Sequence, residues 1–177
     1  FEYTTSRPNG APLRLNDIPI VNFLEQIAAD FELEAQKRHM AIEVSSENRD
    51  VVLELDAEKM VRVINNLLSN AIKYGHENST ILMEVLKKEG VITIAVRNEG
   101  DPISKEVLDQ LFTRFYRAEG SRSKETGGTG LGLAIAENIV HSHGGIMFAE
   151  SENGQTSFYV CLPTENQSSL KEMTNHK

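Results

Sequence analysis

Two stretches of the sequence combine residue types that could bind a phosphate group together with a divalent cation. The first is GGTGLG at positions 127–132, which runs directly into an apolar helical pattern. It is no Walker A loop, because Leu133 stands where that motif needs lysine, and no dinucleotide fingerprint, because Ile135 replaces the third glycine. Glycines before a helix let an anion approach the free backbone N–H groups of its first turn, so the stretch predicts phosphate binding. A flexible hinge before an ordinary helix is the alternative.

The second stretch is VRVINNLLSNAIKY at positions 61–74, which reads as an amphipathic helix with asparagines on its polar side. A solvated helix face normally carries good helix formers, and asparagine is about 0.5 kcal/mol worse than alanine within a helix. An asparagine carbonyl at Asn66 or Asn70 can ligate Mg²⁺, and Lys73 can reach the same phosphate group. This face therefore predicts a site, with an ordinary solvated face as the alternative.

The elements that must position these stretches follow from caps, periodicity and turn residues. Helices are predicted after a cap at Asp17 with Pro19 in the first turn, from Ala57 to about Tyr74 between Asp56 and Gly75, over SKEVLDQLF, and after GGTGLG. Strands are predicted for AIEVS, VVLEL, the hairpin TILMEVLKK with VITIAVRN, GIMFAES and TSFYVCLP. Because helices and strands do not alternate regularly, the pattern predicts an α/β (α+β) two-layer sandwich, a mixed β-sheet backed by α-helices.

Length and charge limit the classes of protein to consider. The chain has 177 residues, 40% of them hydrophobic, which suits one ordinary domain. Its formal net charge of -8 argues against a nucleic-acid partner, and no apolar stretch is long enough for direct membrane insertion. The sequence opens without methionine on an irregular segment, residues 1–16, so we expect a fragment of a longer protein. The polar residues 164–177 predict a disordered C-terminal tail.

With NEGDPI at 98–103 and LFTRFYR at 111–117, these stretches resemble the ATP-binding catalytic domain of bacterial sensor histidine kinases in order and spacing. The resemblance covers residues 17–163, and the sequences of the motifs are similar to those of the vancomycin-resistance sensor kinases. It implies the Bergerat ATP-binding fold shared with heat-shock protein 90, DNA gyrase and mismatch-repair ATPases, with ATP and Mg²⁺ as cofactors under a mobile ATP lid. Residues 1–16 would then be a linker or the end of an upstream dimerisation helix.

The segment NNLLSNAIKY resembles the N box of this family. The resemblance implies that Asn70 ligates Mg²⁺, that Asn66 and Lys73 meet the phosphates, and that Tyr74 packs against the adenine. Hydrolysing members of the wider fold carry a glutamate, the general base for water, where Asn66 stands, and an asparagine cannot take a proton near neutral pH. Transfer to a positioned histidine needs no such base, so histidine kinase activity is favoured over ATP hydrolysis.

The segment NEGDPI resembles the first glycine box, in which Asn98 would read the adenine, Gly100 would allow close approach, and Ile103 would line the base pocket. GQTSF at 154–158 resembles a late element of the family, with Thr156 supporting the adenine site. The family usually has aspartate at the position of Asn98 and glycine at that of Pro102. An asparagine carbonyl still accepts a hydrogen bond, but without charge, so we expect weaker or retuned ATP affinity rather than its loss.

The two remaining boxes would close over the phosphates. LFTRFYR resembles the F box, whose Arg114 and Arg117 would approach the polyphosphate; with Asn66 and Lys73 they are the predicted catalytic residues. The second glycine box would place backbone N–H groups on phosphate through Gly128, Thr129, Gly130, Leu131, Gly132 and Leu133.

The resemblance also implies the reaction partners. No histidine stands in the family's H-E-x-x-P phosphoacceptor context, and a capping role at a helix end accounts for His141 and His143 better than catalysis. The γ-phosphoryl group would therefore pass to a histidine on a dimerisation domain absent from this chain, and then to a response regulator. The fragment would be a monomer and the full protein a homodimer, with this cytoplasmic domain attached to a parent in the bacterial plasma membrane. The alternative is a non-catalytic nucleotide-binding or protein-interaction module that retains the fold.

Overall fold

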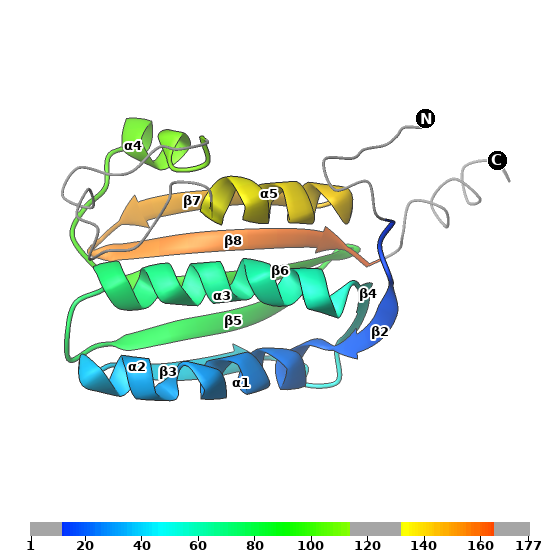
Figure 1. Ribbon diagram of the computed structural model, residues 1–177, viewed down its shortest axis with the longest axis horizontal. Coiled ribbons are helices and arrows are strands. Elements are labelled where there is room, and N and C mark those ends of the chain that lie inside the picture. Colours follow the sequence, from blue (N-terminus) through cyan, green and yellow to red (C-terminus); the bar gives the residue numbers. More distant parts are fainter. Residues whose placement is uncertain (1–11, 114–131, 165–177) are drawn as a thin grey trace, which may run out of the picture.

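The computed structural model describes residues 12–113 and 132–164 and shows a layer of helices over a β-sheet (Figure 1). The strands are β2 (Asn16–Pro19), β3 (Ala41–Ser46), β4 (Val52–Leu55), β5 (Thr80–Lys88), β6 (Val91–Glu99), β7 (Ile146–Glu152) and β8 (Gln155–Pro163). The helices are α1 (Ile20–Asp30), α2 (Glu32–Lys37), α3 (Ala57–Tyr74), α4 (Lys105–Gln110) and α5 (Gly132–Ser142). Helices α1, α3 and α5 lie on one face of the larger sheet, which confirms the predicted two-layer sandwich.

The larger sheet is mixed, with five strands in the order β3-β5-β6-β8-β7. β3 runs parallel to β5, and the other neighbouring strands are antiparallel. β5 and β6 form the predicted hairpin, and its turn residues Glu89 and Gly90 have φ angles of 50° and 80°. The last residues of β6 pair with the first residues of β8, so both strands reach the same end of the sheet.

The helical period of α3 places its apolar side in the core between the two layers. Met60, Ile64, Leu67 and Leu68 are each at most 1% exposed, and Ile92, Ile94 and Val96 of β6, the strand that α3 contacts, are equally buried. Burying one such side chain contributes about 1.5–3 kcal/mol relative to leaving it exposed. This burial determines how α3 is rotated about its axis and leaves the asparagine side facing away from the core.

The start of the first helix differs from the prediction. Asp17 does not cap this helix, because residues 16–19 are extended and pair antiparallel with β4, and α1 begins at Ile20. A proline disfavours the helical region for the residue before it, and at a helix start its missing N–H group costs nothing. Ile20 N donates to Val51 O at 3.0 Å, so pairing with a distant segment decides where the helix begins. The helical pattern also divides at Phe31, between α1 and α2.

Helix α3 begins and ends at the predicted residues. Asp56 accepts hydrogen bonds from Lys59 N at 3.1 Å and from Arg14 N at 3.0 Å. Burial by itself would raise the pKa of the Asp56 carboxyl, but these two N–H donors and the charge on Lys59 outweigh it and hold the pKa below its ordinary value of 3.8. The cap therefore works as an ionised carboxylate at the positive end of the helix.

His143 joins the end of α5 to the start of α3. Its Nε2 accepts from Asp56 N at 3.0 Å, so the ring proton lies on Nδ1, which donates to Ile139 O at 2.8 Å. Burial lowers the pKa of His143 by more than the contact with Ile139 O and the Asp56 charge raise it. The side chain thus serves as a neutral structural contact at the helix end, as the sequence predicted for this histidine.

Candidate active site

The asparagine side of α3 contacts the start of α5. Asn66 is half-buried, and its Nδ2 donates to Gly132 O at 3.0 Å. A Cβ atom at residue 132 would lie 2.6 Å from Asn66 Oδ1, which is closer than non-bonded atoms approach, so a larger residue there would displace the Asn66 side chain from this contact. The two stretches that the sequence marked for ligand binding therefore meet in one place.

The other predicted N-box residues lie C-terminal to Asn66, in the last turns of α3. Asn70 is half-buried, whereas Lys73 and Tyr74 are exposed, Tyr74 to 48%. Residues three and four positions apart share a helix face, so Asn66, Asn70 and Lys73 form one polar strip. The strip leads from the N-terminus of α5 to the C-terminal end of α3.

A buried polar pair lies where β6 and β8 meet. Asn98 and Thr156 are direct partners across the two strands and are 6% and 4% exposed. Asn98 Nδ2 donates to Glu99 O at 3.1 Å, but within residues 12–113 and 132–164 no hydrogen bond reaches Asn98 Oδ1 or Thr156 Oγ1. Because buried polar groups nearly always have partners, this pair offers hydrogen-bonding capacity to a group other than the described residues.

Two glycines let the end of α3 approach β6 beside Asn98. Gly75 and Gly100 form an isolated antiparallel bridge. A Cβ atom at Gly75 would lie 3.3 Å from Asn98 Nδ2, and one at Gly100 would lie 3.3 Å from Tyr74 O, both tighter than ordinary van der Waals contact. The two glycines therefore allow the helix end to lie close to the strand, next to the buried pair.

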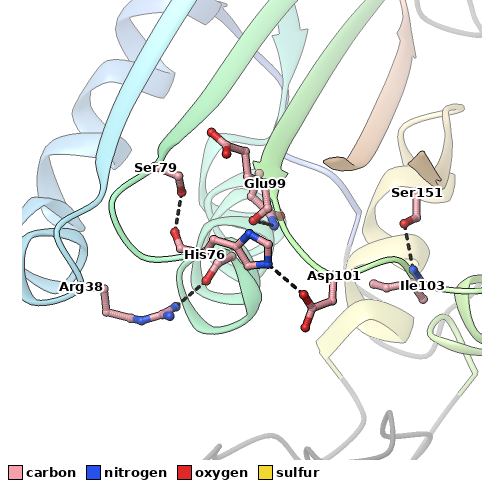
Figure 2. A network of polar contacts seen from close by, with 9 residues as sticks. Arg38, His76, Ser79, Glu99, Asp101, Ile103 and Ser151 are labelled. Atoms are coloured by element: carbon pink, nitrogen blue, oxygen red, sulfur yellow. Dashed lines mark hydrogen bonds and ion pairs between the residues drawn. The ribbon is translucent and has the colours of Figure 1, made fainter. Parts of the chain in front are cut away.

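Polar contacts that the sequence did not predict fix the segment after β6 (Figure 2). His76 N donates to Glu99 O at 2.8 Å, and His76 Nε2 lies 2.9 Å from Asp101 Oδ1. Ile103, the predicted base-pocket residue, is half-buried, and its backbone N donates to Ser151 Oγ at 2.9 Å. The segment is thus attached to the turn after α3 on one side and to β7 on the other. No local pattern marks these partners, because they come from distant parts of the chain.

Part of the predicted site lies outside the described residues, namely Arg114, Arg117, Gly128, Thr129, Gly130 and Leu131. The second glycine box is described from Gly132 onward, and Leu133 is buried beneath the first turn of α5. No group of three His, Cys, Asp or Glu side chains that could hold a metal ion is found in the described ranges. A metal ion held by these residues would need amide oxygens, ligand oxygens or water.

The fold and the candidate site together define a two-layer sandwich in which an asparagine-bearing helix meets the N-terminus of a second, glycine-led helix. A family model described as "Histidine kinase-, DNA gyrase B-, and HSP90-like ATPase" matches residues 55–166. The chain belongs to this ATP-binding family, as a catalytic domain of the sensor histidine kinase type.

Individual relatives agree with this assignment. The sensor histidine kinase WalK of Bacillus subtilis is 37% identical over 153 residues, which cover 85% of this chain and 25% of that protein. The sensor protein VanS of Enterococcus faecium is 36% identical over 165 residues, which cover 92% of this chain and 42% of VanS. The chain therefore spans less than half the length of these two relatives. No helix in the described ranges is long and apolar enough to cross a membrane.

Solved structures show the same fold. The catalytic domain of histidine kinase ThkA matches with a TM-score of 0.77 at 24% identity, over 86% of this chain and 97% of that domain. ThkA has also been solved in complex with the response regulator protein TrrA, and that structure matches with a TM-score of 0.73 at 23% identity, over 85% of this chain and 42% of the ThkA chain.

Proposed function

We propose that the chain binds Mg-ATP between α3, the paired ends of β6 and β8, and the N-terminus of α5, and transfers the γ-phosphoryl group to a histidine of a dimerisation domain outside this chain. The observation that carries the proposal is the contact of Asn66 with Gly132, at 3.0 Å, which joins the N box to the second glycine box. The contact places the polar strip of α3 beside the N-terminus of α5, and a nucleoside triphosphate could bind to both, with its phosphates at the helix N-terminus.

The base side of the proposed site is the buried pair. Asn98 Oδ1 is an acceptor suited to an adenine amino group, and Thr156, its partner across the strands, can support the same contact. Leaving such a buried group unsatisfied costs about 1–3 kcal/mol, so a ligand or a water molecule that fills this position is favoured. Tyr74, exposed to 48%, and Ile103 would pack against the base.

The phosphate side combines Lys73 with the N-terminus of α5 and, by the family resemblance, Arg114 and Arg117 with the glycines from Gly128 onward. Asn70 would hold Mg²⁺ through its carboxamide oxygen. Mg²⁺ commonly keeps several waters and takes the rest of its shell from few protein groups and from phosphate oxygens, so the absence of a carboxylate cluster in the described residues agrees with this assignment.

The residue at the family's hydrolytic position favours phosphoryl transfer over hydrolysis. Asn66 donates its amide to Gly132 O and cannot take a proton from water near neutral pH. In the proposed reaction a neutral histidine nitrogen attacks the γ-phosphorus in line, a nitrogen–phosphorus bond forms, and ADP leaves with the bridging oxygen. Lys73 and the predicted arginines would stabilise the charge that develops on the phosphoryl oxygens.

The wider setting is proposed from the relatives. The phosphoryl group would pass on to a response regulator, the partner in the ThkA complex, and the full protein would be a homodimer with this domain on the cytoplasmic side of the bacterial plasma membrane.

The predicted domain limits, 17–163, stay a prediction. The narrower likeness to vancomycin-resistance kinases also stays a prediction, because WalK and VanS match about equally well. The departures at Asn98 and Pro102 are what favours the alternative, a non-catalytic module.

Calorimetric titration of the chain with ATP, with and without Mg²⁺, tests the binding step. We expect saturable, magnesium-sensitive binding and a dissociation constant at least about tenfold higher for Asn70→Ala, because a metal ligand is lost. Asn65→Ala, the same change elsewhere on the helix, is the matched control. An Asn70→Ala chain that binds Mg-ATP as the unchanged chain does would remove the metal assignment.

Transfer is then tested by adding the dimerisation fragment of the full protein and ATP labelled on its γ-phosphate. Label on the histidine of that fragment supports the kinase, whereas ATP binding without any transfer would favour the non-catalytic module. No binding at millimolar ATP would mean that Asn98 and Pro102 have disabled the base pocket.

A further inference from the structure

Arg38 sits at the end of α2 and directs its guanidinium at the C-terminal end of α3, where three carbonyl groups converge. Its Nη1 donates to Ile72 O, to Lys73 O at 3.2 Å and to Gly75 O at 2.9 Å. Figure 2 shows Arg38 reaching the turn that carries His76. The side chain comes from a part of the sequence that no motif marked.

The end of α3 needs such a partner. The last carbonyl groups of a helix have no N–H donor within the helix. In many helices a following residue in the left-handed conformation lets backbone N–H groups bond to them. Gly75 cannot do this, because it is extended, with φ -74° and ψ 159°, and is bridged to Gly100. Its N–H reaches Ala71 O at 2.9 Å, which leaves Ile72 O and Lys73 O to Arg38. A positive charge is also favoured at this negative end of the helix dipole.

Arg38 is itself held in place from both sides. Its backbone N donates to Ala35 O at 3.0 Å, and its backbone O accepts from Asn78 N at 3.4 Å, beyond the turn that follows α3. Its Nε lies 3.9 Å from Glu77 Oε1, and the side chain of Arg38 is 30% exposed. Arg38 therefore links α2 to the last turn of α3 and to the turn after it.

We propose that Arg38 is a positioning residue of the nucleotide site, which holds the last turn of α3 so that Lys73 and Tyr74 face the ligand. This inference rests on the proposed function, because Lys73 is placed at the phosphates and Tyr74 at the base. Arg38 touches neither ligand nor metal; it acts through the carbonyls of the residues that do.

The first test is Arg38→Ala, with ATP affinity measured by calorimetry and amide hydrogen exchange measured at Gly75. We expect the dissociation constant for Mg-ATP to rise about tenfold, the effect of losing one charge-assisted hydrogen bond from a displaced Lys73 to the phosphates, and exchange at Gly75 to become faster. Arg49→Ala is the matched control, since Arg49 pairs at 2.7 Å with Glu25 on the surface; it should change neither quantity. Arg38→Lys keeps the charge and three donors, but its ammonium nitrogen ends about one bond short of the position of Arg38 Nη1, so it should recover only part of the affinity.

A double-mutant cycle with Lys73→Ala separates positioning from general destabilisation. If Arg38 acts through the last turn of α3, Arg38→Ala should weaken ATP binding much less when Lys73 is already alanine. Equal losses in both backgrounds would overturn the role of Arg38, and so would unchanged affinity in a folded Arg38→Ala chain, or in an Arg38→Met chain if the alanine variant does not fold. If the unchanged chain itself binds no ATP, the proposed function fails instead, and the exchange rate at Gly75 still decides whether Arg38 caps α3.

Discussion

At the scale of single residues, Asn98 shows how one side chain is suited to two tasks. Its Nδ2 group donates to Glu99 O at 3.1 Å, which leaves Oδ1 as an acceptor for the adenine contact proposed above. The aspartate that is usual in the family could serve only the second task, because a carboxylate has no donor. Asparagine thus stabilises the end of β6 even without a ligand.

Asn98→Asp is therefore expected to change stability and affinity in opposite directions. The substitution removes the donor and places a charge at a site that is 6% exposed, so the free energy of unfolding should fall by about 1–3 kcal/mol. Mg-ATP should bind severalfold more tightly, because a charged acceptor makes the stronger hydrogen bond. Chemical denaturation and calorimetry measure the two quantities. Weaker ATP binding in a folded Asn98→Asp chain would argue against Asn98 as the adenine-reading residue.

At the scale of elements, α5 is joined to α3 near both of its own ends. Asn66, in the middle of α3, contacts Gly132 at the start of α5, and Asp56, the cap of α3, contacts His143 just past the end of α5. These two contacts therefore hold α5 against the start and the middle of α3.

The His143 contact predicts a pH dependence of stability. The pKa of His143 is lowered from 6.5 in the folded chain, so folding favours the neutral ring. Its contribution is present above about pH 6.5 and is lost as the pH falls from there through the folded pKa, by about 1.4 kcal/mol for each unit of lowering. His143→Gln keeps a side-chain acceptor for Asp56 N without titrating. Urea denaturation between pH 7.5 and pH 5 should show a flatter stability profile for this variant; identical slopes would contradict the assignment.

At the scale of the whole molecule, the proposed site draws on both layers of the sandwich. Its base side would lie on the sheet, at β6 and β8, and its phosphate side would lie on the helix layer, at α3 and α5. A ligand that bridges the two layers should stabilise the fold against unfolding, because it binds only when both are in place.

Mg-ATP is therefore expected to raise the midpoint of thermal unfolding. At a concentration 100 times the dissociation constant the gain is about 2.7 kcal/mol, which corresponds to about 5–10 °C for a domain of this size. Scanning calorimetry or fluorescence measures the shift. AMP, which lacks the β- and γ-phosphates, should give a smaller shift at equal concentration. An equal shift with AMP would contradict the phosphate contacts proposed for Lys73 and α5.

Local sequence signals predicted most of the elements of this fold and the family to which it belongs. Helix α3 is the clearest example, because the Asp56 cap, the apolar period and Gly75 are all encoded within its own segment. The boxes around Asn70, Asn98 and Gly132 predicted the family for the same reason, since each is a short run recognised by its own residue types and spacing.

Only the tertiary structure decided the features that depend on contacts between distant segments. Residues 16–19 are a strand and not a helix start, because they pair with β4. Gly75 is extended because it bridges Gly100, and this leaves the end of α3 to Arg38. Asn66 meets Gly132, and His76 meets Asp101, across gaps in the sequence that no periodicity spans. Local propensity can specify an element and its exposed face, but which groups meet across elements is determined by packing of the whole core.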